Sequence, residues 1–308
     1  MNRRESLQTF AAATGLAVAP LIGTKPLKEL TGAFKYCLNT STINVQQTGL
    51  KKAVEVTARA EYDMIELWIP DLRKFASDGN TLSSLNKLIR DSGLTVASAI
   101  GFAPWMLADD ASRKKGFDQM EEEMKMMSEL GCTRIAAAPA GLKQGDTVDL
   151  LAIGNYFREL IALGKKTGVM PQLEFWGVSP VFYHLGQVLM VAAAANDPAV
   201  RILADVFHLF RGGSGFEGLR LINGQHIDIF HMNDYPGIPR EEQKDKDRIF
   251  PGDGVAPLND VINVLAATPN TKILSLELFN PDYWKRDPLD VAAAGLKKMK
   301  AAVRQALS

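Results

Sequence analysis

The 308-residue sequence is poor in cysteine and histidine, and it has no excess of either charge. Cys37 and Cys132 are far apart, and no CxxC or Cys/His cluster occurs, so we expect buried free thiols and no disulfide scaffold or zinc finger. Lys plus Arg equal Asp plus Glu at 35 each, without a dense basic run, which argues against nucleic acid as a partner. No G-x-G-x-x-G motif or Walker loop follows the first predicted strand, which disfavours a nucleotide-binding fold.

The first 28 residues differ from the rest of the chain. Arg3-Arg4-Glu5-Ser6-Leu7 precedes a short Ala/Gly-rich run, Phe10–Ala19, and this order resembles a twin-arginine export signal. The run is too short for a stable membrane span. We therefore predict an export signal or flexible N-terminus over residues 1–28, one domain over residues 29–308, and a periplasmic location. An ordinary helical N-terminus on a cytoplasmic protein is the alternative.

From residue 34 onward, short apolar runs alternate with longer amphipathic segments. Nearly continuous apolar runs are typical of parallel strands that are covered on both faces. Eight such units fit a single (β/α)8 TIM barrel, which needs about 250 residues, better than an open doubly wound sheet. The predicted strands are Phe34–Leu38, Met64–Trp68, Thr95–Ile100, Arg134–Ala138, Met170–Phe175, Arg201–Val206, Ile227–Met232 and Lys272–Leu278. The predicted helices include Leu50–Ala60, Leu82–Ser92, Ala111–Leu130 (with Asp110 as its cap), Leu150–Thr167, Leu258–Ala267 and Val291–Ala306.

Four polar side chains end the last four predicted strands: Glu174, Asp205, His231 and Glu277. In a barrel they would converge on the C-terminal rim, where active sites lie. Buried carboxylates that meet at one place repel each other and lose hydration, and one divalent cation removes both costs. Three oxygen donors and an imidazole suit Mn²⁺ best, then Mg²⁺ or Co²⁺, with Zn²⁺ as a further choice. For any of the four alone, a helix cap or ion-pair partner explains the residue equally well.

Several stretches resemble the xylose isomerase-like superfamily of sugar phosphate isomerases and epimerases. They are Leu173-Glu174, Ala204-Asp205-Val206-Phe207-His208, Phe230-His231-Met232-Asn233-Asp234 and Leu276-Glu277, and the likeness covers roughly residues 34 to 305. The resemblance implies one metal ion held by the Glu, Asp, His and Glu, with substrate oxygens completing its coordination. It also implies that Glu174 and Glu277 act as base and acid on the two sides of an enediolate.

The same resemblance points to substrate contacts. His208 fits the family's Asp-x-x-His, and Arg248 fits its Arg-x-x-Pro-Gly-x-Gly loop, which here lies in the long polar segment between Tyr235 and Gly254. Trp176, His184 and Glu66 follow or end predicted strands and are weaker candidates for substrate binding. Aromatic rings and polar groups at a barrel rim suit sugars, although packing explains them equally well.

One departure limits what the resemblance implies. Ketose 3-epimerases have a second glutamate six residues after the first metal-binding one, and this chain has Pro180 there.

We expect a metal-dependent isomerase or epimerase that acts on a sugar or keto-sugar. We expect this substrate to be non-phosphorylated, because export favours free sugars. The alternatives are a lyase or hydratase for a 3-keto-glycoside or inosose-type compound and a non-catalytic sugar-binding barrel. An abasic-DNA endonuclease would use a multinuclear metal site rich in histidine, and four histidines with zero net charge argue against it. The sequence allows a homo-oligomer.

Overall fold

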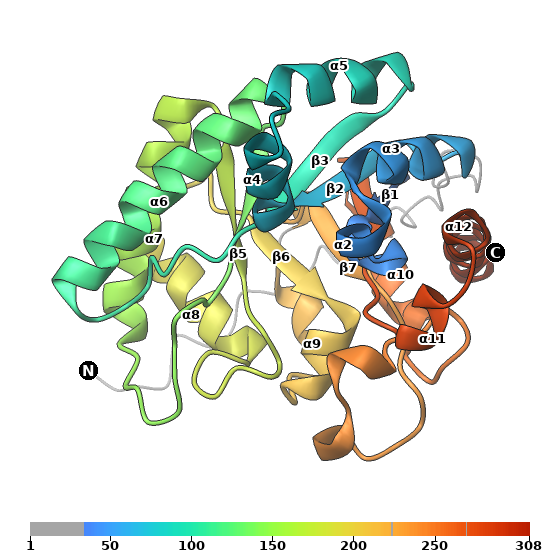
Figure 1. Ribbon diagram of the computed structural model, residues 1–308. Helices are drawn as coiled ribbons and strands as arrows, with labels where there is room; N and C mark the ends of the chain where they lie inside the picture. The colour runs from blue at the N-terminus through green and yellow to red at the C-terminus, as the bar shows by residue number, and fades with distance from the viewer. Residues whose placement is uncertain (1–33, 223, 269) are drawn as a thin grey trace, which may run out of the picture.

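Eight parallel strands with helices between them form the (β/α)8 barrel that the sequence predicts (Figure 1). The computed structural model describes residues 34–222, 224–268 and 270–308. Pairing runs in the order β3-β2-β1-β8-β7-β6-β5-β4, and β3 and β4 lie next to each other to complete the ring. The strands are β1 (Phe34–Asn39), β2 (Met64–Trp68), β3 (Thr95–Ile100), β4 (Arg134–Ala137), β5 (Met170–Glu174), β6 (Ile202–Asp205), β7 (Ile229–Met232) and β8 (Lys272–Leu276).

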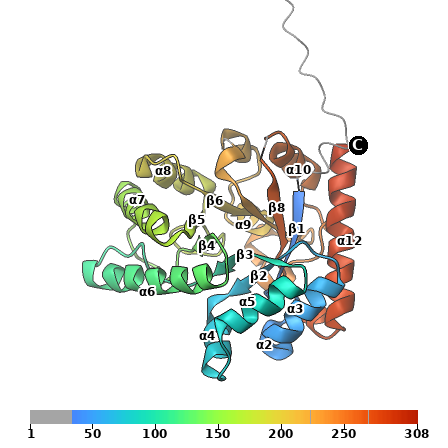
Figure 2. The same ribbon diagram turned by 90° about the horizontal axis from the view of Figure 1, so that it is seen from above.

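Helices surround the strands, and α12 runs along the outside of the barrel near β1 (Figure 2). The α-helices are α2 (Val45–Thr48), α3 (Leu50–Arg59), α4 (Ile69–Ser77), α5 (Leu82–Asp91), α6 (Asp110–Glu129), α7 (Leu150–Thr167), α8 (Leu185–Ala195), α9 (Val206–Arg211), α10 (Leu258–Ala266), α11 (Pro281–Trp284) and α12 (Pro288–Leu307). Short 3-10 helices are η1 (Thr40–Ile43), η2 (Glu217–Leu221), η3 (Gly224–His226), η4 (Arg240–Glu242) and η5 (Asp245–Asp247). The predicted cap of α6 was wrong by one residue. Asp109 accepts the hydrogen bond from Ser112 N at 2.8 Å, whereas Asp110 lies in the first turn.

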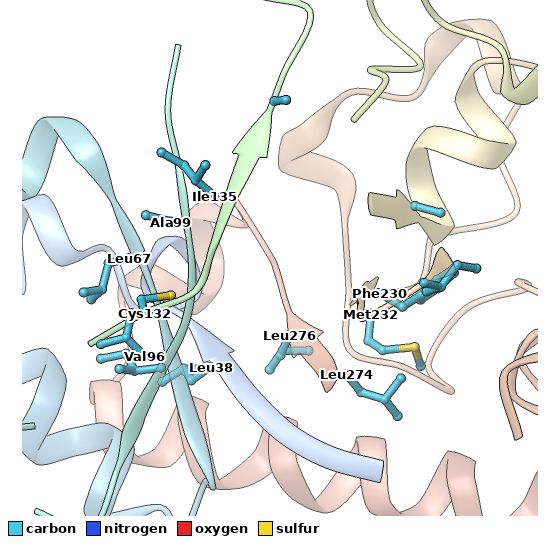
Figure 3. Close-up of a cluster of buried hydrophobic side chains, with 14 of the residues drawn as sticks. Leu38, Leu67, Val96, Ala99, Cys132, Ile135, Phe230, Met232, Leu274 and Leu276 are labelled. Carbon is cyan, nitrogen blue, oxygen red and sulfur yellow. The ribbon is translucent and has the colours of Figure 1, made fainter. Parts of the chain in front are cut away.

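The main hydrophobic core lies between the strands and the helices. Strand residues such as Leu38, Leu67, Ile135 and Phe230 belong to it (Figure 3). Because successive strand residues point to opposite faces, their neighbours in sequence face the barrel interior. Both cysteines are buried free thiols, as expected.

A second cluster of apolar side chains fills the barrel interior, and it includes Leu203, Ile229 and Ile273. Two residues further along the same strands stand Asp205, His231 and Ser275, which are also buried. Since side chains repeat every two residues in a strand, these polar groups face the same interior, one layer closer to the C-terminal rim. The barrel interior therefore has an apolar layer and, next to it on the C-terminal side, a polar layer.

No helix in the described part of the chain is long and apolar enough to cross a membrane. The predicted export signal and the boundary at residues 28 and 29 lie outside the described residues.

Candidate metal centre

Three of the four predicted metal ligands converge where β6, β7 and β8 end. Asp205, His231 and Glu277 each offer a ligand atom within 4.8 Å of the other two. His231 Nδ1 lies 3.2 Å from Glu277 Oε2 and 3.7 Å from Asp205 Oδ2, and it makes no hydrogen bond with any described residue. All three side chains are buried. An unbonded imidazole nitrogen between two buried carboxylates fits a divalent cation.

Glu174, the fourth predicted ligand, ends β5 and lies at the same cavity but outside that group of three. Its Oε2 is buried without a hydrogen-bond partner. Burial raises the pKa of Glu174 to about 8; the charge of His231 opposes this shift, and that of Glu277 adds to it. The role of Glu174 as a metal ligand stays a prediction. Its raised pKa makes its ionised carboxylate more basic than that of an exposed glutamate.

A buried arginine neutralises this carboxylate cluster. Arg248 Nη1 lies 2.7 Å from Asp205 Oδ2 and 2.9 Å from Glu277 Oε2, and its Nη2 donates to Asp245 Oδ1 at 2.7 Å. Burial alone would raise the pKa of Asp205, but the charge of Arg248 holds it well below its usual range. Arg248 Nη2 is also 3.2 Å from Nε2 of His208, whose pKa falls to about 4, chiefly through burial. His208 is therefore neutral near pH 7.

Glu174, Glu277, His208 and Arg248 line one cavity of about 280 Å³. Asp205 and His231 contact these residues but are not among those that line it. Larger cavities occur elsewhere, such as one of about 580 Å³ beside α8, but the cluster of convergent ionisable groups lies here. Trp176, Arg248 and His208, which the sequence suggested as substrate contacts, line the cavity. Phe102, Phe279 and Asp245 also line it and were not predicted to do so. Its lining residues are Trp68, Ile100, Phe102, Glu174, Trp176, Val178, His208, Asp245, Arg248, Glu277 and Phe279.

Residues 54–302 match the family described as xylose isomerase-like TIM barrel. The chain belongs to this family. An inosose isomerase of Bacillus velezensis is 26% identical over 259 residues, covering 82% of this chain and 90% of that protein. A 3-dehydroshikimate dehydratase of Pseudomonas putida is 25% identical over 272 residues, covering 84% of this chain but 40% of that protein. The crystal structure of an IolI protein with bound zinc superposes with a TM-score of 0.80 at 22% identity, over 88% of this chain and 98% of that one.

In this xylose isomerase-like barrel, one aspartate anchors the loop that carries Arg248. The Asp234 carboxylate accepts four backbone hydrogen bonds, and its own backbone pairs with Ile249 in both directions at 2.9 Å. The four donors are Tyr235, Gly252, Gly254 and Ala256. Gly254 is required there, because a Cβ atom would lie 2.2 Å from Tyr235 O. Sequence reasoning found the glycine loop but missed its anchor.

Glu66 lies behind His231, is buried and does not line the cavity, so its predicted contact with substrate stays a prediction. His231 Nε2 is 3.0 Å from Glu66 Oε2, which also accepts from Ser275 Oγ at 2.7 Å and Asn39 Nδ2 at 3.0 Å. Burial alone would raise the pKa of Glu66, but His231 and these donors lower it. The ionised carboxylate therefore holds the proton on Nε2 and leaves Nδ1 facing Asp205 and Glu277.

The variant Glu66→Gln should weaken Mn²⁺ binding by about 10- to 100-fold, the usual effect of losing the carboxylate behind a metal-binding histidine. Isothermal titration of the metal-free protein with Mn²⁺ measures this. Glu123→Gln is the matched control, since Glu123 is equally buried but lies on α6, where it pairs with Arg73 and Gln119. Unchanged affinity in Glu66→Gln would refute the assigned role.

His184 is also placed away from the cavity lining. It is the N-cap of α8, where its Nδ1 accepts from Gly186 N at 2.9 Å and Gln187 completes a capping box. One ring nitrogen of His184 is therefore used at the helix start, and its substrate contact stays a prediction.

Proposed function

We propose that this protein is a divalent-metal-dependent isomerase or epimerase for a non-phosphorylated sugar or keto-sugar, acting by proton abstraction next to a carbonyl. The observation that carries the proposal is that two carboxylates, Glu174 and Glu277, line one cavity beside Asp205 and His231. A divalent cation bound by these four residues would stabilise the negative charge that develops on the substrate oxygens. The zinc bound by the IolI protein supports a divalent ion, and the donor set favours Mn²⁺.

The two carboxylates have different surroundings, which suits them to different halves of a proton transfer. Glu174 Oε2 has no hydrogen-bond partner, and burial raises its pKa to about 8, so its ionised form is a stronger base than an ordinary carboxylate. Glu277 instead accepts hydrogen bonds from Arg248 at 2.9 Å and from Asn39 at 3.1 Å. We assign abstraction of the substrate proton to Glu174 and its return to Glu277, with Arg248 and His208 orienting substrate oxygens.

The charges of the cavity support a substrate without phosphate. Arg248 is the one Lys or Arg among the lining residues, and it is already paired with Asp205, Glu277 and Asp245. His208 is neutral near pH 7, because burial lowers its pKa to about 4. A phosphate dianion would meet carboxylates without an uncommitted cation to balance it.

A lyase or dehydratase reaction is the second candidate, on a 3-keto-glycoside or an inosose-type compound. It shares the first proton abstraction and then expels a leaving group from the adjacent carbon. Pro180, exposed after β5, replaces the glutamate of ketose 3-epimerases, and one relative is named a dehydratase. Both facts support a lyase or dehydratase as the second candidate function.

Incubation in D₂O with Mn²⁺ and a panel of free sugars, keto-sugars, an inosose and a 3-keto-glycoside tests the proposal. We expect deuterium at a carbon next to the carbonyl, seen by NMR, and the identity of the product separates isomerase, epimerase and lyase. Binding without exchange for every compound would refute the enzymatic proposal and favour a sugar-binding barrel.

A further inference from the structure

Four aromatic side chains form a continuous row along the cavity wall, which we call the aromatic arch: Phe279, Trp68, Phe102 and Trp176. Successive ring centroids lie 5.8, 5.8 and 6.0 Å apart, and successive ring planes are inclined by 88°, 39° and 58°. Because the planes turn from one ring to the next, the four rings do not form one flat surface. A flat platform for one sugar face would need nearly parallel rings.

The arch offers little hydrogen bonding to a ligand. Trp68 Nε1 donates to Asn39 Oδ1 at 2.7 Å, and the Trp176 indole interacts with Glu174. The remaining rings have no polar atom, and Ile100 and Val178 extend the same wall. Sugar hydroxyls placed against it would lose hydrogen bonds to water without replacement.

The apolar wall also continues outwards into solvent. Phe102 is 40% exposed and Val178 is 43% exposed, whereas Glu174, His208, Arg248 and Glu277 are buried. Asp245 is the ionisable lining residue that is also partly exposed, and Arg248 pairs with it. The cavity therefore has a polar inner end and an aromatic outer end. A ligand that fills both ends is polar on one side and apolar on the other.

We propose that the aromatic arch is a subsite for an aryl group, so that the substrate is a keto-sugar carrying an aromatic substituent. The sugar oxygens would lie at the inner end, and the aryl ring would lie among Trp68, Phe102 and Trp176. This inference rests on the proposed function for the inner end, but the arch itself is tested by binding alone.

The test compares two ligands with the same sugar, phenyl β-D-glucoside and methyl β-D-glucoside, by calorimetric titration of the full-length protein loaded with Mn²⁺. We expect the phenyl glucoside to bind at least about tenfold more tightly, because ring–ring contacts add to apolar burial. Phe102→Ala should reduce this ratio to near one. Met190→Ala, which removes an equally exposed apolar side chain on α8, should leave the ratio unchanged.

Equal affinities for the two glucosides, no binding of either, or a preference that survives Phe102→Ala would overturn the proposal. Its failure is distinguishable from failure of the proposed function, because deuterium exchange into keto-sugars is measured separately. Exchange without phenyl selectivity would reject the aryl subsite alone. Phenyl selectivity without exchange would support the subsite and reject the enolisation chemistry.

Discussion

Glu174→Gln should lower turnover by about 10²- to 10⁴-fold, the usual contribution of a positioned acid or base, while Mn²⁺ still binds, although more weakly because one of the four proposed ligands loses its charge. The amide cannot take up the substrate proton, yet Asp205, His231 and Glu277 keep their mutual geometry, since Glu174 lies outside their group of three. The rate of deuterium exchange into the substrate measures the loss, and titration with Mn²⁺ measures the retained affinity.

Two further variants sharpen this result. Glu277→Gln should impair both exchange and metal affinity, because Glu277 belongs to the group of three. Glu159→Gln, an exposed position on α7, is the neutral control. A wild-type exchange rate in Glu174→Gln would show that another group moves the proton. Loss of Mn²⁺ from Glu174→Gln would show instead that this carboxylate is needed as the fourth ligand.

Arg248→Met should destabilise the metal-free protein by about 3–5 kcal/mol, the cost of removing one partner from a buried ion pair. Asp205 and Glu277 would then repel each other without the guanidinium between them. Saturating Mn²⁺ should reduce the loss, because the cation replaces the missing charge and binds the folded state. Urea unfolding with EDTA and with Mn²⁺ gives the two free energies of unfolding.

The control is Arg220→Met on η2, whose ion pair with Glu217 is exposed and should contribute about 0–1 kcal/mol under both conditions. An equal loss for Arg248→Met with and without Mn²⁺ would contradict the electrostatic account. The destabilisation would then come from packing, since the guanidinium also lies over the rings of Phe207 at 4.6 Å and Phe279 at 5.1 Å.

The barrel and the convergence of the metal ligands could be predicted because both depend on local patterns. An apolar run that ends in a polar residue predicts a buried strand whose last residue lies at the C-terminal rim of the barrel. Parallel strands bring such ends together. Asp205, His231 and Glu277 each follow this pattern, and so does Glu174 at the edge of the same site. The family match then confirms the resemblance that these residues suggested.

The role of Glu66 could not be predicted in the same way. It also stands within an apolar strand, but its partner His231 is 165 residues away on the far side of the interior. Which interior side chains meet across a barrel depends on strand tilt and register, and β2 even shifts register against β3 at Ile65 and Glu66. The capping role of His184 was missed for the opposite reason, because it depends on a purely local hydrogen bond at the start of α8.

The anchoring of the Arg248 loop has an evolutionary consequence. His231 lies in β7 and Asp234 follows three residues later, so the predicted metal ligand and the anchor of the arginine-bearing loop are held by one short stretch of chain. The stretch from Pro239 to Glu242 lies outside the hydrogen bonds to Asp234, and its side chains are exposed. Insertions and substitutions can therefore accumulate in that stretch without breaking the hydrogen bonds that hold the Arg248 loop.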